Sequence, residues 1–254
     1  MSEDSALTLG SVYACVRVLS ESVAQLPLVL YQRKGEREKR PAVDHPLFRL
    51  LHDGPNPELS SFELREFMMA NLLLRGNALA AIERDRQGRV VSLWPVRWDQ
   101  IECRRVDGEL VYLWTPPGAP PALIRRADAW HIRGLSLDGL TGLSPIAFHR
   151  EVIGNGLAMQ EYGSRLFSNG ATVRGVLEHP NKLGPENATR LRAQWDEMHG
   201  GLSSSHKTAV LEDGMKYHQI SIAPDDAQYL ESRKFNRTEV ASIFRVPPHK
   251  IGDL

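Results

Sequence analysis

Two long helical segments in the second half of the chain constrain its fold more than any other feature. Ser144 and Pro145 favour a helix start, because proline at the first helical position gives up no needed hydrogen bond, and a helical pattern follows over about residues 146–167. Pro224 precedes a second helix, which we expect to end near Arg245. The two helices bracket a small module, so this part of the chain leaves along one helix and returns along the other.

The bracketed module and the first half of the chain both mix helices with short strands. The module pattern predicts, in order, a strand, a helix and two strands at 174–177, 185–199, 209–211 and 217–220. In the first half, helices are predicted at 8–25, at 45–52 and from Ser60 or Ser61 to about Leu74. Strands are predicted at 28–31, 78–83, 90–96, 101–105, 110–114 and 129–132, with an exposed proline-rich loop at 116–121. The fold class expected is α+β.

Charge and cysteine content narrow the classes of function. The 31 basic residues balance the 31 acidic residues, so net charge gives no general attraction to nucleic acid or to an anionic membrane. Two cysteines, Cys15 and Cys103, are too few for a disulfide framework and suit a reducing cytosol. No apolar run approaches the roughly 18 residues of a membrane span, so we expect no membrane segment.

No motif for catalysis or cofactor binding is present. The chain lacks GxxxxGK[ST], GxSxG, HExxH and paired-cysteine zinc spacings, so we expect no enzymatic activity, cofactor or bound metal. The alternative is a metal-dependent hydrolase that uses the His131 and His149 region with Asp128 and Asp138. Their spacing matches no known ligand pattern, and we favour His131 as a hydrogen-bonded strand residue and Asp138 as part of an Asx turn.

Basic and aromatic residues offer two further candidate surfaces. Glu36 and Glu38 interrupt the basic residues between positions 33 and 40, which disfavours a phosphate-binding patch, so we interpret this stretch as a solvated hairpin tip. Trp195, on the helix of the small module, is a candidate contact with a partner, although packing within the module is the simpler interpretation. The other four tryptophans lie in or beside strands and should pack a sheet face.

A series of short motifs resembles HK97-type phage portal proteins. Each motif is weak alone, but their common order from about Leu9 to the last residue makes the resemblance specific. The motifs are Pro55-Asn56, Leu72 to Ala78, Leu93-Trp94-Pro95, Gly134 to Gly139, Gly142 to Pro145, Phe167 to Gly170, Gly175 to Glu178, Val210 to Lys216, Asp226 to Glu231, Arg233 to Phe235 and Val246 to Leu254.

The resemblance implies a portal-protein fold in five segments: a wing at 1–142, a first stem helix at 143–169, a clip module at 170–223, a second stem helix at 224–245 and the start of a channel (tunnel) loop at 246–254. Relatives continue with a returning helix and a helical crown. We therefore expect a C-terminal truncation and, if the chain ends at Leu254, impaired ring assembly.

The resemblance also implies a non-enzymatic subunit of a closed ring, typically of twelve copies, at one vertex of a phage capsid. Such a head-tail connector conducts double-stranded DNA during packaging and ejection, and it binds the terminase large subunit, a head-tail adaptor and the major capsid protein. It is assembled in the bacterial host cytoplasm and belongs to the virion. A protein-binding adaptor without a DNA conduit remains a further alternative.

Two sets of residues are candidates for these roles. A glycine inside a helix costs about 1 kcal/mol relative to alanine, so glycines in the first long helix indicate close packing. We expect packing between subunits at Gly154, Gly156 and Ala158, and rings of polar or positive groups near the DNA at His249, Lys250 and Arg245.

Overall fold

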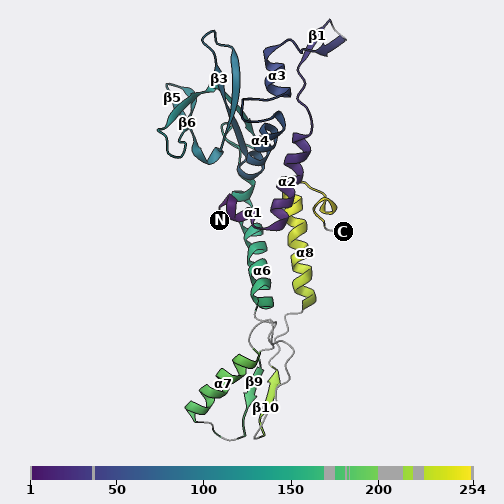
Figure 1. The fold of residues 1–254 in the computed structure, drawn as a ribbon, viewed down its shortest axis with the longest axis vertical. Helices are drawn as coiled ribbons and strands as arrows, with labels where there is room; N and C mark the ends of the chain where they lie inside the picture. The colour runs from purple at the N-terminus through teal and green to yellow at the C-terminus, as the bar shows by residue number, and fades with distance from the viewer. Residues whose placement is uncertain are drawn as a thin grey trace. The chain divides into compact units, whose positions relative to one another are not determined.

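The computed structural model describes residues 2–35, 38–168, 175–180, 182, 184–199, 214–219 and 226–252, and its elements are drawn in Figure 1. The chain divides into two compact units. Unit 1 comprises Met1–Gly154 with Arg237–Leu254, and unit 2 comprises Asn155–Asn236. Within the described ranges, no helix combines the length and the apolarity that a bilayer crossing requires.

The N-terminal helices of unit 1 begin and end at the caps that their sequence provides. Ser60 accepts a hydrogen bond from the Glu63 backbone N–H, and the Glu63 carboxylate accepts one from the Ser60 N–H, which forms a capping box. Gly76, with a φ of 69°, ends the same helix in the left-handed conformation. The predictions of the three longer helices are confirmed. The helices are α1 (Glu3–Leu7), α2 (Gly10–Ala24), α3 (Pro46–His52) and α4 (Ser61–Arg75).

A three-stranded antiparallel sheet packs against α4 in unit 1. The strand order is β4-β3-β8, with β3 at Asn77–Arg84, β4 at Val90–Val96 and β8 at Ala129–Arg133. On the face toward α4, Ala78 and Ala80 are buried with Leu64, Met68 and Leu93. Because side chains alternate along a strand, Leu79 points to the opposite face. The bounds of these three strands agree with the predictions to within one residue at every end.

A second antiparallel sheet covers that opposite face. Its order is β5-β6-β7, with β5 at Ile101–Val106, β6 at Glu109–Trp114 and β7 at Ala122–Arg125. Leu79 is fully buried here in a cluster with Val96, Tyr112, Ile124 and Ala129. Strand β7 was not predicted, since it has four residues of which only Ile124 is buried, and such a segment carries no alternation to recognise.

A two-stranded hairpin follows α2, but not over the predicted residues. Strand β1 covers Tyr31–Lys34 and pairs with β2 at Glu38–Pro41, so the predicted strand at 28–31 is wrong except at Tyr31. Gly35 adopts a φ of 73° directly after β1, a left-handed conformation that glycine accommodates without strain. All eight strand residues are exposed, so no apolar pattern marks this hairpin in the sequence.

The first long helix begins where it was predicted but is interrupted once. Helix α5 covers Pro145–Phe148, and α6 covers Arg150–Ser168. Between them His149 has φ −105° and ψ 26°, outside the helical region. The second long helix, α8, covers Asp226–Ile243, and a 3-10 turn, η3, follows at Pro248–Ile251.

Unit 2 also contains the small module. Strand β9 (Gly175–Glu178) pairs antiparallel with β10 (Lys216–Gln219), and α7 covers Pro185–His199. The predicted order of strand, helix and strand is therefore confirmed for these three elements. The strand predicted at 209–211 lies outside the described residues.

Candidate assembly and channel sites

Glycines let two distant segments of unit 1 touch through their backbones. A Cβ on Gly76 would overlap the carbonyl of Leu143, and a Cβ on Gly142 would overlap the carbonyl oxygen of Gly76. The Gly134 N–H also donates to that oxygen at 2.8 Å. No larger residue fits at Gly76 or Gly142, so the loop at 134–142 is fixed to the end of α4 by main-chain contact.

The buried amide of Asn77 joins the same segments. Its nitrogen donates to the carbonyls of Arg75 at 3.0 Å and Gly142 at 2.8 Å. Its oxygen accepts from the Gly142 N–H at 2.7 Å and from Nε2 of His131 at 3.0 Å. Asn77 is 1% exposed, and these four bonds use its full hydrogen-bonding capacity. Sequence reasoning missed this role, although Asn77 lies in a recognised motif.

His131 is held as a neutral structural group. With Nε2 protonated toward Asn77, Nδ1 accepts from the Tyr112 hydroxyl at 3.0 Å, and the ring stacks on Trp98 at 4.8 Å between centroids. Burial lowers the pKa of His131 from 6.5 to about 4, and the positive charges of Arg133 and Arg126 act in the same direction. The interpretation of His131 as a hydrogen-bonded strand residue is confirmed.

The metal-dependent hydrolase finds no support in this region. Asp128 pairs with Arg84 at 2.8 Å. Asp138 accepts hydrogen bonds from the backbone of Thr141 and Leu140, which lower the pKa of its carboxyl and form the predicted Asx turn. In the ranges that the structure describes, no group of three or more His, Cys, Asp or Glu side chains could hold a metal ion.

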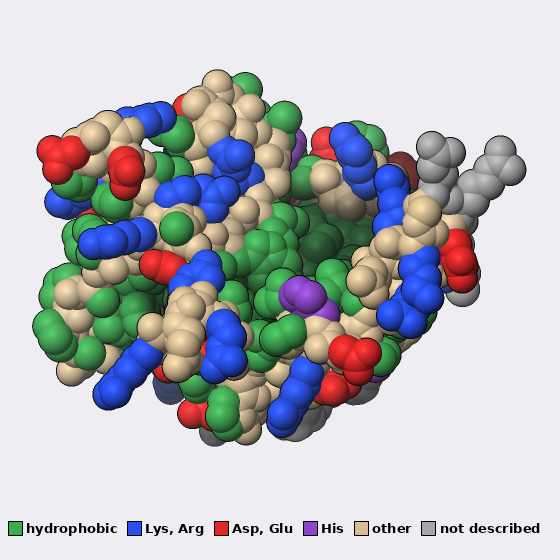
Figure 2. Space-filling view, turned by 90° about the horizontal axis from the view of Figure 1, so that it is seen from above, with side chains coloured by type: hydrophobic (Ala, Val, Ile, Leu, Met, Phe, Trp, Pro, Cys, Tyr) green, Lys and Arg blue, Asp and Glu red, His purple; other side chains and the backbone are tan. Residues whose placement is uncertain are grey.

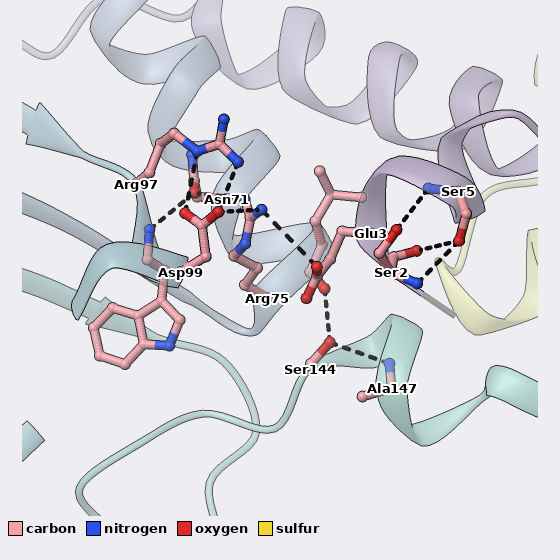
Figure 3. Close-up of polar contacts among 11 residues, drawn as sticks. Ser2, Glu3, Ser5, Asn71, Arg75, Arg97, Asp99, Ser144 and Ala147 are labelled. Carbon is pink, nitrogen blue, oxygen red and sulfur yellow. Dashed lines mark hydrogen bonds and ion pairs between the residues drawn. The ribbon is translucent and has the colours of Figure 1, made fainter. Parts of the chain in front are cut away.

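The buried side chain of Arg75, at the end of α4, lies beside two acidic side chains (Figure 3). Arg75 is 8% exposed, and its guanidinium lies 3.3 Å from the Asp99 carboxylate and 3.9 Å from that of Glu3. It also donates to the Asn71 side chain at 3.3 Å. The hydrogen bond from Arg97, with the charge of Arg75, lowers the pKa of the Asp99 carboxyl. Because a buried charge is costly without a partner, this cluster fixes α1 and the η1 turn (Trp98–Gln100) to α4.

Ser144 attaches the start of α5 to the last turn of α4 (Figure 3). Its hydroxyl donates to the Leu74 carbonyl at 2.8 Å and accepts from the Ala147 N–H at 3.1 Å. The recognised motifs at 72–78, 134–139 and 142–145 therefore meet at one polar junction. The hydrogen bonds of this junction hold the end of α4 and the start of α5 in place, so the role of the junction is structural.

Helices α6 and α8 touch within unit 2 at a glycine. The Tyr229 hydroxyl donates to the Met159 carbonyl at 2.8 Å, and a Cβ on Gly163 would overlap that hydroxyl. The Tyr162 ring meets the Tyr229 ring edge-on at 5.6 Å, and the Arg233 guanidinium lies 5.9 Å from the Tyr229 ring centre. Gly163 thus allows the close approach of the two helices.

The predicted packing positions lie earlier on α6. A Cβ on Gly154 would meet no described atom within 4 Å, whereas Gly156 is buried and Ala158 is exposed. Gly154 therefore makes no close contact with the part of the chain that the structure describes, and the roles of these three residues between subunits stay predictions. The missed residue, Gly163, follows Gly156 by seven positions, and this two-turn spacing on one helix face could have indicated it.

The three candidate channel residues are exposed after the end of α8. Arg245 has a φ of 55°, which ends the helical path, while Val246 beside it is 4% exposed. His249 and Lys250 lie on the η3 turn, which packs against α2. Their side chains are accessible on an anchored turn, and their position relative to a channel stays a prediction.

Trp195 packs within the small module. Its ring stacks on that of Tyr217 in β10, with centroids 5.3 Å apart and planes inclined by 25°, and the residue is partly buried. This arrangement fits the simpler interpretation, and contact with a partner stays a prediction.

The fold is that of solved phage portal proteins. The crystal structure of an HK97 family phage portal protein from Corynebacterium diphtheriae superposes with a TM-score of 0.69 at 17% identity, covering 98% of this chain and 77% of that chain. The neck of a native gene transfer agent particle, computed with C12 symmetry, gives a TM-score of 0.66 at 22% identity, covering 98% and 69%. The predicted α+β portal-protein fold is confirmed.

The chain belongs to the phage portal protein family, whose sequence profile matches residues 11–254. It is 34% identical to the probable portal protein of Streptomyces phage phiC31, over 98% of this chain and 56% of that protein. It is 31% identical to the portal protein of Enterobacteria phage HK97, over the whole of this chain and 60% of that protein. The chain thus spans little more than half the length of these two relatives, and the family recognised from the sequence is confirmed.

Proposed function

We propose that this chain is a non-enzymatic subunit of a portal ring that conducts double-stranded DNA at one capsid vertex. The observation that carries the proposal is the family match along nearly the entire chain, together with the similarity to the HK97 portal protein. In this proposal residues 1–142 form the wing, 170–223 the clip, and the two long helices the stem. The subunit is assembled in the host cytoplasm and remains in the virion.

A closed ring requires two different surfaces on each subunit that fit each other by rotation. The contact of α6 with α8 at Gly163 leaves other side chains of the two helices without cover: Tyr162, Leu230 and Phe235 are 46%, 57% and 66% exposed. Contact with a neighbouring copy would remove this apolar surface from water. Gly154, Gly156 and Ala158 are the proposed close-packing positions, and twelve copies are expected by analogy with the C12 neck.

Conduction requires weak contact between protein and DNA. Each phosphate that Lys or Arg neutralises adds salt-dependent affinity and thus resists sliding. The equal numbers of acidic and basic residues in the chain suit this requirement. His249, Lys250 and Arg245 are the proposed lumen groups. A ring structure in which His249 and Lys250 point away from the lumen would exclude that assignment.

The proposed protein partners follow from the family. The clip, with Trp195 as a candidate contact, would face the terminase large subunit during packaging and the head-tail adaptor afterwards. The wing would contact the major capsid protein.

Particle images of the purified chain test the proposed function. Because ring assembly of a chain that ends at Leu254 is expected to be weak, mild chemical cross-linking at high protein concentration is used to retain the assemblies. The retained particles should be closed rings with a central opening wide enough for a DNA duplex. Cross-links between copies should join α6 of one copy to α8 of the next, because a ring interface is heterologous.

Compact two-fold dimers, in which the same helix links to itself, would contradict the ring. Discs without an opening would instead support the adaptor without a DNA conduit.

A further inference from the structure

One face of the β1–β2 ribbon carries two positive charges beside an aromatic ring. Arg33 lies directly opposite Lys39 in the strand register, and Tyr31 is two residues before Arg33 on the same face. The Lys39 ammonium lies 5.2 Å from the Tyr31 ring centre, and Tyr31 is 51% exposed. Neither Arg33 nor Lys39 forms an ion pair with a residue that the structure describes. We call Tyr31, Arg33 and Lys39 the cationic face.

The opposite face of the ribbon carries one carboxylate among its cations. Lys34 lies opposite Glu38, and Arg40 lies opposite Gln32, to which its guanidinium donates at 3.4 Å. In the linear sequence Glu36 and Glu38 separate basic residues, and on that ground the stretch was interpreted as a solvated tip. The strand register puts Glu38 on the face opposite to Arg33 and Lys39, and Glu36 lies outside the described residues.

The cationic face does not stabilise the ribbon. Like charges directly opposite each other destabilise an antiparallel pair. A two-stranded ribbon is marginally stable by itself, and all eight strand residues of this one are exposed. Two repelling cations are therefore retained where a neutral pair would hold the strands together better, which points to an anionic partner.

We propose that the cationic face binds the phosphate backbone of double-stranded DNA without reading its sequence. Arg, Lys and Tyr side chains are all regular phosphate ligands, and the major groove of DNA admits a two-stranded ribbon. Figure 2 shows several Lys and Arg side chains at the right of the view, with Asp and Glu side chains among them. The inference deepens the proposed function, on which it rests for the presence of DNA, by adding a contact outside the candidate lumen residues.

The test is binding of a short fluorescent DNA duplex to the full chain by anisotropy over a range of salt concentrations. The double substitution Arg33→Gln with Lys39→Gln removes two phosphate contacts. We expect the affinity at low salt to fall about tenfold or more, and the slope of log affinity against log salt to become shallower by about 1.8.

The matched control is Lys34→Gln with Arg40→Gln, which removes the same charge from the other face of the same ribbon. It should keep the affinity within about twofold of the parent. The cationic-face variant should unfold no more readily than the control, because it relieves a like-charge pair, so lost binding would not reflect lost folding.

Equal losses in the two variants would overturn the proposal, since the ribbon would then act only through net charge. So would unchanged binding in both, or selective loss of binding to a polyglutamate peptide, which would assign the face to an acidic protein. If closed rings form but any of these results is obtained, the DNA contact is refuted and the proposed ring stands. Face-selective DNA binding without rings would refute the ring and leave the contact standing.

Discussion

His131 illustrates, at the scale of one residue, how burial makes stability depend on pH. The unfolded chain takes up a proton at this residue near pH 6.5, whereas the folded chain does so only near pH 4. Between these values the unfolded state binds more protons, so the free energy of unfolding falls as the pH is lowered. The slope is at most about 1.4 kcal/mol per pH unit, and because the ring is only partly buried the full loss stays below about 3 kcal/mol.

Urea unfolding of the parent and of His131→Gln between about pH 7 and pH 5 measures this contribution. The variant should be less stable near neutral pH by about 1–3 kcal/mol, because Asn77 and Tyr112 lose a partner. Its stability should nevertheless fall less steeply as the pH decreases. His249→Gln, at an exposed histidine, serves as control and should retain the parent profile. Parallel profiles for all three proteins would show that His131 is not the group responsible.

At the scale of secondary structure, the close contact between α6 and α8 makes stability sensitive to a single added methyl group at Gly163. In Gly163→Ala the added Cβ displaces the Tyr229 hydroxyl, which then loses its bond to the Met159 carbonyl. We expect a net loss of about 1–3 kcal/mol, although alanine favours the helix by about 1 kcal/mol. Gly154→Ala is the matched control, since it adds a Cβ to the same helix with no described atom nearby, and it should be neutral or stabilising.

Chemical unfolding of both variants measures the difference. The Tyr229→Phe variant lacks the hydroxyl that the new Cβ would meet. Adding Gly163→Ala to that variant should therefore lower the free energy of unfolding by less than it does in the parent. If Gly163 and Gly154 respond alike, the close approach at Gly163 does not control the pairing of these helices.

Elements with local signals were predictable from the sequence, and contacts between distant segments were not. The capping box of Ser60 and Glu63 marks the start of α4, and the turn that ends at Gly88 marks the start of β4, because both signals lie within a few residues. The ribbon carries no such signal, since all eight of its strand residues are exposed. The sites depend on longer separations, since Tyr229 bonds to a carbonyl 70 positions earlier. A periodic pattern contains no information about such partners.

At the scale of the whole molecule, the division of contacts into two units predicts that substitutions at His131 and at Gly163 affect stability independently. His131 belongs to unit 1, and Gly163 belongs to unit 2. Substitutions at distant sites without shared partners add to within about 0.5 kcal/mol. The double variant His131→Gln with Gly163→Ala should therefore lose the sum of the two single losses.

Hydrogen exchange read element by element distinguishes independent units from one cooperative unit. Gly163→Ala should speed exchange in α7 and β9 while β3 and β4 keep the parent rates, because only unit 2 loses packing. His131→Gln should do the reverse. Faster exchange in both units after either substitution would mean that α6 and α8, whose residues are divided between the two units, transmit the loss across the boundary. The chain would then unfold as a single body despite its divided contacts.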